Sequence, residues 1–107
     1  MSSIIFIEDT EFENEVLKAQ QLVLVYFWAP WCGPCKLVSP SVESIADTYS
    51  DRLKVIKMEV DPNPESRAIC KVEGVPALRL FNNGELIESL EGAVGKPKLQ
   101  AMLEAHL

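Results

Sequence analysis

The chain has 107 residues and a formal net charge of −6, with 48% hydrophobic and 24% charged residues. These values are typical of one small soluble domain spanning residues 1–107. The acidic charge disfavours contact with phosphate backbones and anionic lipid, so we expect neither nucleic acid nor a membrane as a partner.

The chain shows no pattern of membrane insertion or secretion. No apolar run approaches the roughly 20 residues that cross a bilayer. The apolar run at residues 4–7 lacks a preceding basic region, unlike a signal peptide. We therefore expect a cytoplasmic protein. Its three cysteines, Cys32, Cys35 and Cys70, do not suggest a disulfide-stapled scaffold, and the Cys-x-x-Cys pair indicates redox chemistry or a metal site.

Strand and helix patterns alternate in the first half. The β-branched run at 4–7 predicts a strand, and residues 10–13 resemble a capping box that opens a helix ending near Gln20. Leu22–Trp28 is apolar almost throughout, which is typical of a central strand buried on both faces. An amphipathic helix follows the cysteine pair, with Cys35 on its apolar side.

The second half predicts three more strands and two more helices. The strands cover residues 53–60, 77–81 and 85–90, and the helices run to about Cys70 and to Leu107. Asn83-Gly84 between the last two strands is the strongest short hairpin signal. The alternating first part requires parallel strands, and the hairpin adds an antiparallel edge. The sequence thus predicts an α/β fold with a central mixed five-stranded sheet flanked by four helices.

The two cysteines of the pair have different predicted roles. Thiol–disulfide exchange needs a thiolate, and a free cysteine with a pKa of about 8.5 is little ionised at neutral pH. Cys32 is expected at the start of the helix, whose N–H groups and dipole favour an anion, so we expect its pKa to fall to around 7. Cys32 is then the exposed nucleophile that forms a mixed disulfide with a target. Cys35, buried and protonated one turn later, resolves it.

Residues beside the pair predict a substrate surface. Gly33 permits close approach of a substrate backbone, and Pro34 suits the first helical turn. Trp31 offers an apolar surface to a partner, whereas Trp28, at the end of a buried strand, is in part a core residue.

A second segment is expected to complete this groove. Pro76 follows Gly74-Val75 at the start of a strand, where a proline removes a ladder hydrogen bond, so a cis bond in a tight turn is expected. Gly92 allows another backbone to come close.

The sequence closely resembles the thioredoxin family over the whole chain. The matching residues are 27–36 (Phe-Trp-Ala-Pro-Trp-Cys-Gly-Pro-Cys-Lys), Pro40, Lys57, Asp61, Gly74-Val75-Pro76, Phe81, Asn83-Gly84 and Gly92. The resemblance implies a thioredoxin fold, a cis proline at Pro76, a peptide groove, and re-reduction by a thioredoxin reductase using NADPH or ferredoxin electrons. The redox-active group is then the Cys32–Cys35 disulfide itself, with no bound cofactor, and we expect a monomer.

One position departs from the family. Thioredoxins typically carry a buried Asp where this chain has Tyr26, near the strand lysine that is here Lys57. That Asp is thought to take the proton from the resolving cysteine. Tyr26, with a reference pKa of about 10, is no strong base at neutral pH. A tyrosine here resembles certain cyanobacterial thioredoxins. We expect Cys35 to lose its proton to water or to the leaving thiolate.

Other interpretations of the pair remain open from sequence. A zinc site needs four ligands, and only Cys70 and His106 remain, both on predicted helices far along the chain. Cys70 is expected to be a small hydrophobe or a partly exposed thiol, with regulatory oxidation or glutathionylation as a lesser alternative.

Two further functions compete with a protein-disulfide reductase. One is an oxidase or isomerase, although Gly-Pro between the cysteines favours a reducing couple. The other is a binding or assembly subunit that uses the surface around Trp31, Pro76 and Gly92.

Overall fold

The computed structural model describes residues 3–107, and a single mixed sheet runs through its centre. The strand order is β1-β3-β2-β4-β5. The strands are β1 (Ile4–Phe6), β2 (Leu22–Trp28), β3 (Leu53–Glu59), β4 (Ala77–Asn82) and β5 (Glu85–Glu91). β3 pairs in parallel with β1 and β2, whereas β4 is antiparallel to β2 and β5 to β4. The predicted α/β fold with a mixed five-stranded sheet is confirmed.

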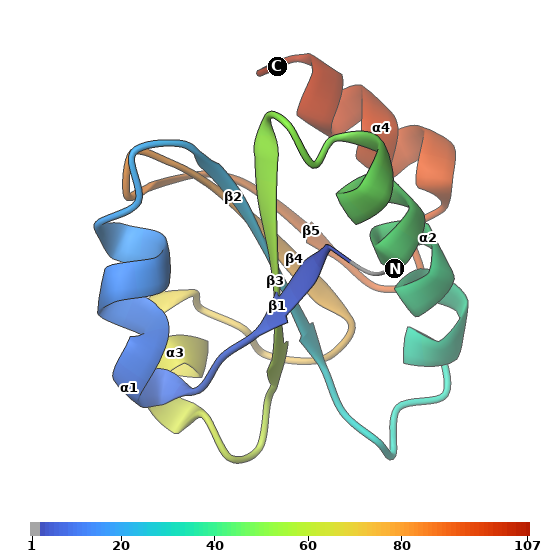
Figure 1. The fold of residues 1–107 in the computed structure, drawn as a ribbon. Helices are drawn as coiled ribbons and strands as arrows, with labels where there is room; N and C mark the ends of the chain where they lie inside the picture. The colour runs from blue at the N-terminus through green and yellow to red at the C-terminus, as the bar shows by residue number, and fades with distance from the viewer. Residues whose placement is uncertain (1–2) are drawn as a thin grey trace.

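Helices cover both faces of the sheet (Figure 1). On one face lie α1 (Asp9–Phe12), its π-helical continuation η1 (Glu13–Leu17) and α3 (Pro64–Ile69); on the other lie α2 (Cys35–Thr48) and α4 (Lys96–Glu104). β2 is buried on both sides because its residues alternate between two apolar cores. Val25 and Phe27 join the core beneath α1 and α3, whereas Leu24 and Tyr26 join the core beneath α2 and α4.

The first helix differs from its predicted bounds. It begins at Asp9 and ends at Leu17, not near Gln20. The capping contact also lies two residues earlier than predicted, because the Glu11 carboxylate accepts a hydrogen bond from the N–H of Glu8 at 3.1 Å. At its other end, the helix stops where the β4–β5 turn packs against the carbonyl of Leu17.

Asp9 ties the first helix to α3. Its carboxylate accepts hydrogen bonds from the N–H groups of Glu65 at 3.0 Å and Ser66 at 2.8 Å, at the start of α3. Partial desolvation would raise the pKa of Asp9, but a hydrogen bond from the Ser66 hydroxyl, together with these two backbone bonds, outweighs it and lowers the pKa below its ordinary value. The contact fixes the loop before α3, which carries Asp61 to the site described below.

The β4–β5 turn has the predicted hairpin geometry. Asn83 and Gly84 both adopt left-handed conformations, with φ of 50° and 83°. Positive φ at both central residues is what a type I′ turn requires. The Asn-Gly pair therefore stands at the two turn positions that need a left-handed backbone.

Gly84→Ala should lower the free energy of unfolding by about 1–3 kcal/mol, since a Cβ there is strained by the positive φ and overlaps the Leu17 carbonyl oxygen. Asn83→Gly, which keeps the left-handed turn, is the matched control and should change stability by less than about 0.5 kcal/mol. Urea unfolding of the three proteins checks this. Equal stability of Gly84→Ala and the parent would contradict the close packing of the turn.

Candidate functional site

The cysteine pair forms a disulfide at the junction of β2 and α2. The Cα atoms of Cys32 and Cys35 lie 5.4 Å apart, and Cys35 is the first residue of the 14-residue helix α2. The N–H of Cys35 donates to Sγ of Cys32 at 3.2 Å. The sulfur thus accepts a hydrogen bond from the first N–H group of α2, although the N-cap residue is Pro34. When the disulfide is reduced, this position favours a thiolate at Cys32.

The burial of the pair departs in part from prediction. Cys35 is 3% exposed, which confirms that it is buried. Cys32 is only 4% exposed in the disulfide form, so the prediction of an exposed Cys32 is wrong for this form. The reason is local: its N–H bonds the carbonyl of Ala29 at 3.1 Å, and its sulfur turns inward to Cys35. Both cysteines nevertheless line a surface cavity of about 290 Å³.

Tyr26 connects β2 to the first turns of α2. Its hydroxyl donates to the carbonyl oxygen of Cys35 at 3.2 Å and lies 2.8 Å from Oγ of Ser39. The side chain is fully buried. Burial raises the pKa of Tyr26, against the opposing effect of the Ser39 hydrogen bond. Tyr26 therefore keeps its proton at physiological pH and acts as a neutral hydrogen-bond partner of α2.

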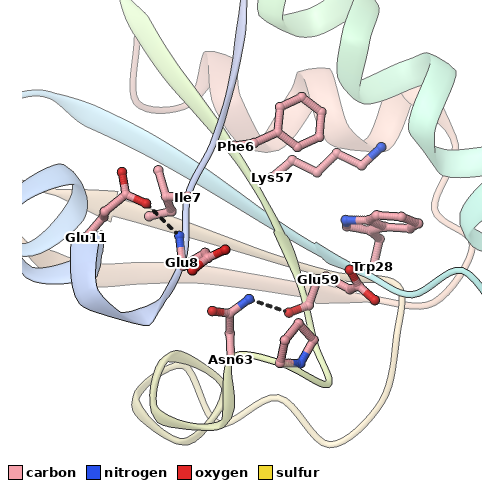
Figure 2. Close-up of a pocket in the computed structure, with 9 residues that line it drawn as sticks. Phe6, Ile7, Glu8, Glu11, Trp28, Lys57, Glu59 and Asn63 are labelled. Carbon is pink, nitrogen blue, oxygen red and sulfur yellow. Dashed lines mark hydrogen bonds between the residues drawn. The ribbon is translucent and has the colours of Figure 1, made fainter.

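Lys57 lies among aromatic rings behind the disulfide. Its Nζ is 4.6 Å from the ring centroid of Trp28, 5.6 Å from that of Phe6 and 5.8 Å from that of Tyr26. Figure 2 shows the lysine side chain with Phe6 and Trp28 on either side, in a cavity of about 280 Å³. Lys57 also lines the cavity that contains the cysteines. Cation–π contacts thus hold a positive charge beside the pair.

Trp31 is held in an exposed position next to Cys32. The indole is 66% exposed, and its Nε1 donates to a carboxylate oxygen of Asp61 at 2.7 Å. This partner is not evident from the sequence, because Asp61 stands 30 residues later, in the loop after β3. The hydrogen bond restricts the orientation of a large apolar side chain beside the disulfide.

The predicted groove segments meet at one end of the sheet. The Val75–Pro76 bond is cis, as predicted. Ala77 pairs with Phe27, so Pro76 lies at the end of the sheet from which the Cys32 turn leaves β2. The carbonyl of Pro76 accepts a hydrogen bond from the N–H of Gly92 at 2.9 Å.

Four glycines and prolines of the predicted groove are exposed, whereas Pro76 is buried. Gly74 and Gly92 are exposed, and an added Cβ at either would meet no other atom within 4 Å. At Gly92 the φ of 83° is the feature that favours glycine. Gly33 and Pro34 are exposed in the turn between the cysteines.

Cys70 is a core residue and takes no part in this site. It is 0% exposed, which contradicts the alternatives of a partly exposed or regulatory thiol. Burial raises the pKa of Cys70 to about 12, although the charge of Arg79 acts in the opposite direction. His106 lies elsewhere, with Nε2 2.9 Å from a carboxylate oxygen of Glu88. Among residues 3–107, no group of three or more His, Cys, Asp or Glu side chains is arranged to hold a metal.

The buried Cys70 thiol should make stability fall at alkaline pH. The raised pKa means that its contribution is full below the unfolded value near 9.0 and is lost as pH rises toward 12. Between pH 7 and pH 10 the oxidised parent should lose about 1–2 kcal/mol more stability than Cys70→Ala. Urea unfolding at several pH values measures this; parallel curves for the two proteins would contradict it.

Comparison with known proteins agrees with the site. A family model of thioredoxin matches residues 3–105. The chain is 57% identical over 105 residues to a thioredoxin-like protein of Synechocystis sp., covering 98% of this chain and 96% of that protein. It is 45% identical over 105 residues to the thioredoxin of Acidithiobacillus ferridurans, covering 98% and 97%. It is 42% identical over 107 residues to thioredoxin 1 of Synechococcus elongatus, covering all of both chains.

Within residues 3–107, no helix combines the length and apolar character needed to cross a bilayer.

Thioredoxins in general act with thioredoxin reductase and with disulfide-containing targets. With full-length similarity to thioredoxins and a Cys-x-x-Cys disulfide at the start of α2, the chain belongs to the thioredoxin family and is a thiol–disulfide oxidoreductase.

Proposed function

We propose that the protein is a protein-disulfide reductase in which Cys32 attacks and Cys35 resolves. The observation that carries this proposal is the hydrogen bond from the N–H of Cys35 to Sγ of Cys32 at the start of α2. It supports a thiolate at Cys32 and not at Cys35, because only the Cys32 sulfur accepts a helix N-terminal N–H. The two thiols of the reduced protein thereby differ in acidity.

The proposed reaction passes two electrons to the target. The Cys32 thiolate attacks one sulfur of the target disulfide, that S–S bond breaks, and the first target sulfur leaves as a thiolate. The resulting mixed disulfide joins Cys32 to the target. The Cys35 thiolate then attacks Sγ of Cys32, the second target sulfur leaves, and the protein is left with the Cys32–Cys35 disulfide. The disulfide pair is itself the redox group, so the reaction needs no bound cofactor.

Cys35 must lose its proton before or during the second step. Tyr26 keeps its own proton and cannot accept another at neutral pH. We propose that the proton passes to water or to the departing target thiolate. The cavity of about 290 Å³ lined by Cys35, Ser39 and Lys57 supports a route to water. The positive charge of Lys57 within it favours the developing thiolate.

The target is proposed to bind across the two backbone segments near the pair. Trp31, Gly33 and Pro34 supply one side of this groove. Gly74-Val75-Pro76 and Gly92 supply the other.

The proposed partners are a thioredoxin reductase, linked to NADPH or ferredoxin, and cytoplasmic proteins that carry disulfides. We propose that the protein acts as a monomer and as an electron carrier between the two.

Reduction of insulin disulfides tests this function. The oxidised protein is mixed with insulin and either NADPH with an NADPH-linked reductase or reduced ferredoxin with a ferredoxin-linked one. Insulin reduction that depends on both this protein and one reductase is expected. A protein that oxidises reduced targets but reduces none would be an oxidase. Full biological function of a Cys32→Ser, Cys35→Ser double variant would instead indicate an assembly role.

A further inference from the structure

Arg79, in the middle of β4, is buried and fully hydrogen-bonded. The residue is 2% exposed. A guanidinium has five N–H donors, and the guanidinium of Arg79 donates five hydrogen bonds. They reach the carbonyl oxygens of Cys70, Lys71, Leu78 and Leu90 and the carboxylate of Glu91.

One set of these bonds holds the end of α3. Nε donates to the carbonyl of Cys70 at 2.7 Å, and one Nη donates to that of Lys71 at 3.1 Å. Lys71 is left-handed, with φ of 54°, and the N–H of Val72 bonds the carbonyl of Arg67 at 3.0 Å. This is a Schellman-type helix end. It leads directly into the segment that starts at Gly74.

The other set holds the end of β5. The guanidinium donates to the carbonyl of Leu90 at 3.3 Å and to the carboxylate of Glu91 at 3.2 Å. Gly92 follows at once, and its N–H bonds the carbonyl of Pro76. One buried side chain therefore fixes the chain just before each of the two segments on the far side of the groove.

A buried cation at this position lowers the stability of the fold relative to an apolar side chain. The same face of β4 carries Ala77 and Phe81, both in the apolar core beneath α1 and α3. A hydrophobic side chain there would avoid the desolvation of a buried charge. What an apolar side chain cannot do is hold four carbonyls from three separate segments in one geometry. A groove that binds its target through two backbone segments needs the groups of those segments placed to within about 0.5 Å.

We propose that Arg79 is a positioning residue for target binding. It holds residues 74–76 and Gly92 in the geometry that pairs with the target backbone, without touching the target or the sulfurs. The inference rests on the proposed reductase function.

The test compares Arg79→Met with Arg79→Lys and with a control, Lys54→Met. Lys54 is suited as control because its Nζ also holds a backbone carbonyl, that of Glu15 at 2.8 Å, on β3 and away from the groove. The first readout is amide hydrogen exchange at Gly92, whose N–H bonds Pro76. We expect at least about tenfold faster exchange in Arg79→Met, an intermediate rate in Arg79→Lys, and no change in Lys54→Met.

The second readout is the ratio of kcat/KM for insulin to the rate constant for a small aromatic disulfide that needs no groove. Arg79→Met should lower this ratio about tenfold through a higher KM for insulin. Unchanged exchange at Gly92, or an equal fall for both disulfides, would overturn the proposal. If Arg79→Met does not fold, the same two measurements on Arg79→Lys decide between the proposal and its contradiction. A parent protein that does not reduce insulin would refute the reductase function, while Gly92 exchange would still decide the role of Arg79.

Discussion

Replacing Cys32 by Ser should lower the turnover of protein disulfides by at least about 1,000-fold. The hydroxyl of a serine is not ionised by a helix N-terminus near neutral pH, so no nucleophile remains to open the target disulfide. Cys35 cannot substitute, since its sulfur lacks the helix N–H contact that the sulfur of Cys32 makes. Insulin reduction with reductase in excess measures the loss.

Cys35→Ser separates the two roles. It keeps the attacking thiolate but removes the resolving one, so a target should accumulate as a mixed disulfide on Cys32, visible by mass spectrometry. Cys70→Ala is the matched control and should retain turnover, because Cys70 is buried away from the pair. Trapping of the target on Cys35 in a Cys32→Ser variant would reverse the assigned roles.

Tyr26→Asp should destabilise the protein at neutral pH by about 3–5 kcal/mol. The substitution removes a fully buried ring from the core beneath α2 and α4 and places an acid there. Burial raises the pKa of such an Asp above its unfolded value of about 3.9. The charge-related loss is therefore absent below about pH 4, grows as pH rises, and levels off above the folded pKa.

Unfolding in urea between pH 4 and pH 8 measures this change. Tyr26→Phe is the control: it keeps the ring and loses only the bonds to Cys35 and Ser39, which should cost about 1 kcal/mol with little pH dependence over this range. Equal stability of Tyr26→Asp and the parent at neutral pH would refute the expectation. An unchanged rate and pH profile of the resolving step in Tyr26→Asp would show that position 26 takes no part in it.

Much of the fold was predictable because its signals are local. The apolar run of Leu22–Trp28 indicated a strand buried on both faces, and Asn83-Gly84 indicated the hairpin. The start of a helix at the cysteine pair followed from the change of pattern there, although α2 begins at Cys35 and not, as predicted, at Cys32. Pro76 before a strand indicated the cis bond. In each case the deciding signal lies within a few neighbouring residues of the sequence.

The errors and omissions concern contacts between distant segments. The first helix stops at Leu17 because the turn at Gly84 packs against it. The helical periodicity of the sequence carries no information about this contact. The partner of Trp31 comes from a loop 30 residues away. Arg79 would be expected on the surface from its charge alone, and its burial depends on carbonyls that only the folded chain brings together. The burial and hydrogen bonding of Arg79 could therefore be interpreted only from the structure.

The reduction potential of the Cys32–Cys35 couple is the most direct test of the reductase assignment. It is measured by equilibrating the protein with dithiothreitol or glutathione buffers and quantifying the free thiols of the pair. A value near −270 mV is expected for a couple that reduces target disulfides. A value near −120 mV would make the protein an oxidant and would contradict the account.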